Sequence, residues 1–147
     1  MAGGQAMDLA AGAMAAGGDA FDLAGVTRLQ QMKTGALIAA SVEAGAILGR
    51  VPPDARVHLR GYARDLGLAF QIADDLLDAE GDEAAAGKRL RKDDEQGKAT
   101  FLTLLGPDRA REQLRMLVDQ AVEHLRSYGE EADLLRAVAR YVADRDR

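Results

Sequence analysis

Phe70-Gln71-Ile72-Ala73-Asp74-Asp75-Leu76-Leu77-Asp78 is the stretch in which an apolar helix abruptly presents three carboxylates. At about 100° per residue, Asp74 and Asp78 lie one turn apart on one helix face, and Asp75 lies beside them. Further acids follow toward the C-terminus of the helix, where the macrodipole is already negative, so the group is unfavourable on its own. The pattern therefore predicts carboxylates that converge.

Two environments would relieve this repulsion. Mg²⁺ favours one or two carboxylates, several waters and substrate phosphates, so a DDxxD face suits a metal held between the protein and a diphosphate. The alternative is a solvated helix end, because runs of charge usually face the solvent. The stretch by itself leaves both interpretations open.

Composition narrows the classes of function. The chain has 147 residues and a net charge of -5, which indicates one domain and gives no basic patch for nucleic acid. It has no cysteine, so disulfides and thiolate metal sites are excluded. The most apolar run, Thr34 to Gly49, contains Glu43 and falls short of a membrane span. The N-terminus lacks the features of a signal peptide, and we expect a cytoplasmic protein.

The apolar periodicity predicts helices and no sustained strand alternation, so the expected fold class is all-α in one domain. Thr27 is a favoured capping residue and is expected to open the second helix after a loop. The predicted helices cover 1–16, Thr27 to about Gly49, Pro53 or Asp54 to about Ala79, Ala99 to Leu105, Asp108 to about Tyr128, and Leu134 to Asp144. The apolar stripe of the second helix comprises Leu29, Met32, Leu37, Ile38, Val42 and Ile47. The expected buried positions of the third are Val57, Tyr62, Leu66, Phe70, Ile72, Ala73, Leu76 and Leu77.

The sign of the charge reverses after the acidic stretch. A glycine-punctuated loop is predicted from Glu80 to Gly97, and its basic residues extend to Lys98: Lys88, Arg89, Arg91, Lys92 and Lys98. Such a loop beside a Mg²⁺-binding helix suits a diphosphate, but a solvated, self-paired loop is the alternative. Lys33-Thr34-Gly35 adds a cation and a hydroxyl within an apolar helix, although a lone lysine there usually reaches the surface.

Together these segments resemble the trans-isoprenyl diphosphate synthases, the farnesyl and geranylgeranyl diphosphate synthase family. The resemblance covers essentially the whole chain and rests on ordered motifs: Gly3-Gly4-Gln5-Ala6-Met7-Asp8-Leu9, Lys33-Thr34-Gly35-Ala36-Leu37-Ile38, the stretch from Phe70 to Asp78, and Gly87-Lys88 with Lys92-Asp93 through Gly97-Lys98-Ala99-Thr100.

The resemblance implies a helical bundle in which diphosphates meet Mg²⁺ in a deep cavity. The family joins an allylic diphosphate to isopentenyl diphosphate, which implies a trans-prenyltransferase. By position, the implied metal ligands are Asp74, Asp75 and Asp78, with Asp75 acting directly or through water. The implied contacts of the allylic diphosphate are Lys33, Thr34, Gln71, Lys88 and Lys98, of which Lys33, Thr34 and Lys98 carry the catalytic role. Gln5 and Phe70 would line the cavity.

The resemblance is to the C-terminal half of the family's bundle, a partial polyprenyl synthase domain over 1–147. The first Asp-rich motif of the family is absent, and Arg91 stands where the family commonly has glycine. We expect the short chain alone to be inactive or nearly so, and a homodimer or self-association through an exposed apolar face. The alternatives are a helical module that binds a diphosphate or a partner without turnover, and a terpene cyclase. Farnesyl diphosphate is the preferred product.

Overall fold

The computed structural model describes the backbone of residues 22–85 and 100–144, and the side chains of 22–79 and 100–144. These ranges contain helices and no strand. The elements are α2 (Leu23–Gln30), a π-helical turn η1 (Gln31–Gly35), α3 (Ala36–Leu48), α4 (Pro53–Ala85), α5 (Phe101–Leu105), α6 (Pro107–His124), a 3₁₀ turn η3 (Glu130–Ala132) and α7 (Asp133–Asp144). The all-α class is confirmed.

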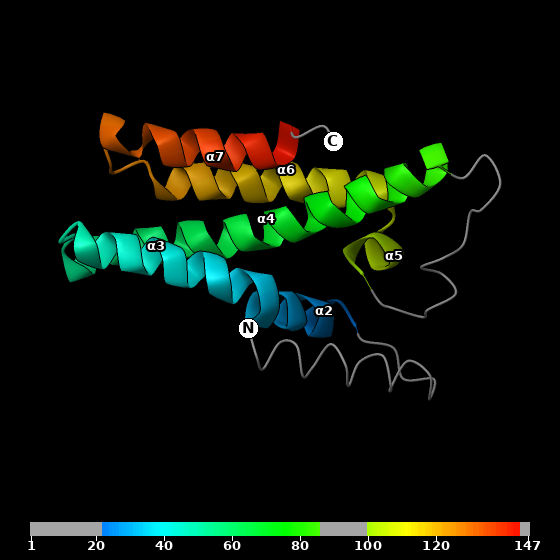
Figure 1. The fold of residues 1–147 in the computed structure, drawn as a ribbon, viewed down its shortest axis with the longest axis horizontal. Helices are drawn as coiled ribbons and strands as arrows, with labels where there is room; N and C mark the ends of the chain where they lie inside the picture. Colours follow the sequence, from blue (N-terminus) through cyan, green and yellow to red (C-terminus); the bar gives the residue numbers. More distant parts are fainter. Residues whose placement is uncertain (1–21, 86–99, 145–147) are drawn as a thin grey trace.

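The helix α4 runs through the middle of the fold (Figure 1). On one side α6 and α7 pack along it, and on the other side α2, η1 and α3 form one bent rod that crosses it. The short α5 lies near the C-terminal part of α4. Apolar side chains between these layers form one core, in which Tyr62, Ile72, Leu125 and Val26 are the largest fully buried side chains.

Several predicted helix ends differ from those observed. The second helix begins at Leu23 because the carboxylate of Asp22 accepts from Gly25 N at 2.8 Å, so Thr27 is not its cap. The third helix continues past Ala79 to Ala85, which places the start of the predicted loop within α4. The fifth ends at His124 and not at about Tyr128. The predicted helix over 1–16 lies outside the described residues.

Some burial predictions were also wrong. Val57, Leu37 and Ile47 were expected to face the core, yet their exposed fractions are 61%, 53% and 51%. The helix α3 is apolar on nearly all sides, and α4 covers one of them, so periodicity could not choose its inner face. Leu48, at its end, is 83% exposed.

Asp65 is the one buried charged residue that the described ranges contain. Its carboxylate receives Arg64 Nε at 2.8 Å and lies 3.0 Å from His124 Nε2, which connects α4 to α6. The His124 ring passes over Gly61, where an added Cβ would come within 2.5 Å of it. The contacts with Arg64 and His124 give the buried carboxylate the polar partners that it loses by leaving water.

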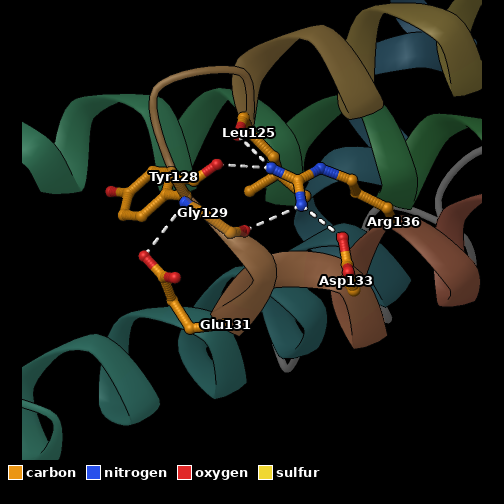
Figure 2. A network of polar contacts seen from close by, with 6 residues as sticks. All are labelled: Leu125, Tyr128, Gly129, Glu131, Asp133 and Arg136. Carbon is orange, nitrogen blue, oxygen red and sulfur yellow. Dashed lines mark hydrogen bonds and ion pairs between the residues drawn. The ribbon is translucent and has the colours of Figure 1, made fainter.

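The connection between α6 and α7 is held by Arg136 (Figure 2). Its guanidinium donates to the carbonyls of Leu125, Tyr128 and Gly129 at 2.8, 2.6 and 2.9 Å, and to Asp133 at 2.6 Å. These carbonyls lie at and beyond the end of α6, where carbonyl oxygens have no N–H donor within the helix. Arg136 therefore stabilises the turn that reverses the chain.

Candidate functional site

The described part of the site forms where the bent rod crosses α4. Gln31 to Gly35 adopt a π-helical turn between α2 and α3, and such turns recur at functional sites. At the crossing, an added Cβ at Gly67 would lie 3.0 Å from the Cα of Gly35. The bare backbone at Gly67 therefore permits an approach that a side chain there would prevent, whereas a Cβ at Gly35 would meet Gln30 O, at the start of its own turn, at 3.3 Å.

This close approach brings Thr34 beside Gln71. Thr34 is adjacent to Gly35, and Gln71 is one turn beyond Gly67 on α4. Thr34 Oγ1 donates to Gln71 Oε1 at 3.0 Å in a partly buried setting. The hydroxyl and the amide that the sequence selected as diphosphate contacts are thus brought together by the helix crossing.

The three carboxylates of α4 lie in different environments. Asp74 and Asp75 are half-buried, whereas Asp78 is exposed. Asp75 Oδ2 accepts from the backbone N–H of Phe101 at 3.2 Å, at the start of α5. Burial raises the pKa of Asp75 to about 6; the hydrogen bonds from Phe101 and Gln71 oppose this, and Asp74 and Asp78 add to it.

No group of three or more acidic or histidine side chains in the described ranges is arranged to hold a metal ion. Asp75 is directed to α5, and the assignment of Asp74, Asp75 and Asp78 as metal ligands stays a prediction. Asp74 and Asp78 remain one helical turn apart, and two carboxylates with water and phosphate oxygens are a donor set that Mg²⁺ accepts. The residues present fit such an ion once a diphosphate supplies the other ligands.

The remaining predicted site residues divide into two groups. Lys33 lies on the π-helical turn next to Thr34, and Phe70 precedes Gln71 on α4; both are half-buried. Gln5, Lys88 and Lys98 lie outside the described residues. The sequence predictions omitted Gly67 and the Phe101 amide. For Gly67, the available signal was that two apolar helices each contain a glycine, at Gly35 and at Gly67, where they could approach closely.

Comparison with known proteins places the chain in a family. The sequence model of the polyprenyl synthetase family matches residues 1–141. Farnesyl diphosphate synthase of Escherichia coli (strain K12) is 40% identical over 151 residues, covering 100% of this chain and 49% of that protein. Farnesyl diphosphate synthase of Geobacillus stearothermophilus is 36% identical, with 99% and 48% covered.

Solved structures show the same likeness. An FPP/GFPP synthase from Zymomonas mobilis has a TM-score of 0.81 at 56% sequence identity, and the match covers 97% of this chain and 45% of that chain. The chain thus spans about half the length of the relatives it matches. On the family match and these identities, the chain belongs to the polyprenyl synthetase family.

Proposed function

We propose that this chain supplies one side of the diphosphate site of a trans-prenyltransferase. In a protein of the relatives' full length, the reaction is the head-to-tail condensation of isopentenyl diphosphate with an allylic diphosphate, giving farnesyl diphosphate or a similar short-chain product. The observation that carries the proposal is the crossing at Gly35 and Gly67, which sets Thr34 beside Gln71, one turn from the carboxylates of α4.

In the proposed reaction, the allylic C–O bond breaks, pyrophosphate departs, and the double bond of isopentenyl diphosphate attacks the carbocation before a proton is lost. Asp74 and Asp78 would lead the binding of Mg²⁺, with Asp75 contributing directly or through water. Bound Mg²⁺ would stabilise the negative charge that develops on the departing pyrophosphate.

The chain's cations and polar groups would hold the same diphosphate from its other side. Lys33 and Thr34 would contact it from the π-helical turn and Gln71 from α4, with Lys88 and Lys98 joining from the segment between α4 and α5. Phe70, with Gln5, would line the cavity for the hydrocarbon part of the substrate. The proposal places this chemistry in the cytoplasm.

Exposed apolar side chains on α3 support the proposal that another part of the assembled protein covers this helix. Leu37, Ile47 and Leu48 are exposed on α3, a helix that is apolar nearly all round. Because large apolar patches seldom remain solvated, the proposal includes self-association or a homodimer. No helix in the described ranges combines the length and the hydrophobicity needed to cross a membrane.

The proposal is tested by titrating magnesium pyrophosphate into the chain in a calorimeter. Asp74→Asn should weaken the Mg²⁺-dependent affinity at least about tenfold, because a charged contact is worth about 1.5–3 kcal/mol. Asp119→Asn is the matched control, since Asp119 is an exposed carboxylate on α6 and its loss should change the affinity less than about twofold. Equal effects of the two substitutions would show that the acidic stretch is only a charged surface.

A further inference from the structure

An apolar cavity lies at the end of the bundle that is remote from the proposed diphosphate site. Its volume is about 430 Å³, and its walls on α3, α4 and the connection between α6 and α7 include Val42, Ala46, Leu59 and Ala132. Small-molecule sites occupy roughly 300–1,000 Å³ and are mostly apolar. Figure 1 shows the α3–α4 and α6–α7 connections at the same end of the bundle, with α5 at the opposite end. Along α4, Leu59 precedes Asp74 by about 22 Å, so the cavity is a separate place.

Gly45 widens this cavity. It lies within α3, where glycine is less stable than alanine, and a glycine kept in a helix usually has a packing or functional reason. An added Cβ at Gly45 would meet no atom within 4 Å, whereas one at Gly67 would lie 3.0 Å from the opposite backbone. Close packing therefore does not explain the glycine at position 45, and its effect is to leave room for a side chain's volume beside the apolar walls.

The hydroxyl groups that line the cavity have already donated their protons. Tyr128 Oη donates to Ala55 O at 2.7 Å, and Ser41 Oγ donates to Leu37 O at 2.9 Å. Each hydroxyl has a single proton to donate, but its oxygen still has lone pairs that accept. Among the described residues that line the cavity, the side chains therefore offer acceptors to a ligand and no free hydroxyl donor.

Glu131 is the one charged residue among the described residues that line the cavity. It is exposed, and it lies with Tyr128 on the connection between α6 and α7 (Figure 2). Gly129 N donates to Glu131 Oε1 at 3.0 Å, and an added Cβ at Gly129 would come within 2.6 Å of Oε2. The absence of a side chain at Gly129 leaves the space that the carboxylate occupies. The edge of the apolar cavity therefore has an anion that a backbone amide holds in place.

We infer that this cavity binds a small apolar amine. The hydrocarbon body of the amine would lie against the walls from α3, α4 and the α6–α7 connection, and its ammonium group would donate to the carboxylate of Glu131. A carboxylate or phosphate in place of the ammonium group would meet an anion and acceptor oxygens, which disfavour it. The inference does not rest on the proposed function, because no residue of the cavity belongs to the diphosphate site.

The head-group preference is tested by NMR titration of the chain with three probes that share one hydrocarbon ring: cyclohexylmethylamine, cyclohexylmethanol and cyclohexanecarboxylate. The amine should bind at least about threefold more tightly than the alcohol, which is the scale of an exposed ion pair, and the carboxylate should bind more weakly than the alcohol. Equal affinities for the amine and the alcohol would mean a cavity that selects only apolar bulk. That result, or no binding of the amine, would overturn the inference.

Two variants test the parts of the site. Glu131→Gln keeps an oxygen that can accept from the Gly129 amide but removes the charge, so the preference for the amine should fall to less than about 1.5-fold. Glu130→Gln is the matched control, because Glu130 is an exposed neighbour that does not line the cavity, and it should leave the preference unchanged. Gly45→Leu fills the open space and should weaken both the amine and the alcohol at least about fivefold. Equal effects of the two glutamine substitutions, or unchanged binding in Gly45→Leu, would contradict the assignment.

The place of binding is read in the wild-type chain, so it does not depend on how Gly45→Leu folds. The amine should shift the backbone amide signals of Ala46 and Ala132 most, since both residues line the cavity. An ammonium group is also attracted to the acidic stretch of α4. Larger shifts at Thr34 and Gln71 than at Ala46 and Ala132 would place the amine beside that stretch and overturn the inference.

Discussion

Substituting Gly67 by alanine tests whether the close helix crossing builds the site. The new Cβ would lie 3.0 Å from the Cα of Gly35, whereas carbon atoms pack best at about 3.5–4.0 Å. The neighbouring atom belongs to the backbone, so no side chain can turn away, and α4 and the π-helical turn must separate by about 0.5–1 Å. Separation on that scale lengthens the Thr34–Gln71 hydrogen bond beyond its present 3.0 Å.

The magnitude follows from two opposing effects. Overpacking in a tight core costs about 1–3 kcal/mol. Alanine in place of a helical glycine returns about 0.5–1 kcal/mol. We therefore expect Gly67→Ala to lower the free energy of unfolding by about 1–2 kcal/mol, and the melting temperature by about 3–6 °C.

The measurement is urea unfolding followed by circular dichroism, with Gly45→Ala as the matched control. Gly45 lies within α3, and an added Cβ there meets no atom within 4 Å. That substitution should therefore stabilise the protein by about 0.5–1 kcal/mol. If Gly67→Ala were as stable as Gly45→Ala, the crossing would not depend on a bare backbone and the reasoning would be refuted.

Two further predictions concern charged groups. Without divalent cations, folded Asp75 binds its proton more tightly than the unfolded chain does, because burial raises its pKa from the ordinary value of 3.8 to about 6. This stabilising effect of protonation is lost as the pH rises through about 6. In urea unfolding, the free energy of unfolding of Asp75→Asn relative to the wild type should therefore increase by on the order of 1–2 kcal/mol between about pH 4 and 7. A difference that stays constant with pH would contradict the raised pKa. Arg136→Lys should cost about 1–3 kcal/mol in the same assay, because lysine cannot reach the Leu125, Tyr128 and Gly129 carbonyls together. Arg140→Lys, at an exposed position of α7, should change stability by less than about 0.5 kcal/mol, and equal losses would show that the Arg136 hydrogen bonds in Figure 2 contribute nothing.

Helix type and order were predictable because apolar periodicity is a local property of the chain. Helix ends were less so. Asp22 and Thr27 are both favoured caps, and the choice between them depends on which carboxylate or hydroxyl meets a free amide. The end of α6 at His124 coincides with carbonyls taken by Arg136, whose place beside them depends on the packing of α7. A short-range pattern contains no signal for either.

The site was predictable in its chemistry and less so in its assembly. Lys33-Thr34-Gly35 and the acidic stretch were selected from residue type and spacing, and the structure brings Thr34 to Gln71. The role of Gly67 was missed because its significance lies in the opposite backbone at Gly35, 32 positions away, and not in its own helix. A glycine in an apolar helix has the same local pattern whether its surroundings are open, as at Gly45, or closed.

Asp74, Asp75 and Asp78 lie within five positions of one another, yet their side chains lie in different environments. Helix geometry turns successive side chains by about 100°, so Asp74 and Asp75 point in different directions although they are adjacent. The start of α5 covers only one of these directions, and Phe101 supplies an amide there that needs an acceptor. Asp75 is therefore drawn into the packing, with a raised pKa, while Asp78 stays exposed. The different environments of Asp75 and Asp78 therefore depend on where α5 begins and not on the residue type, which is the same at both positions.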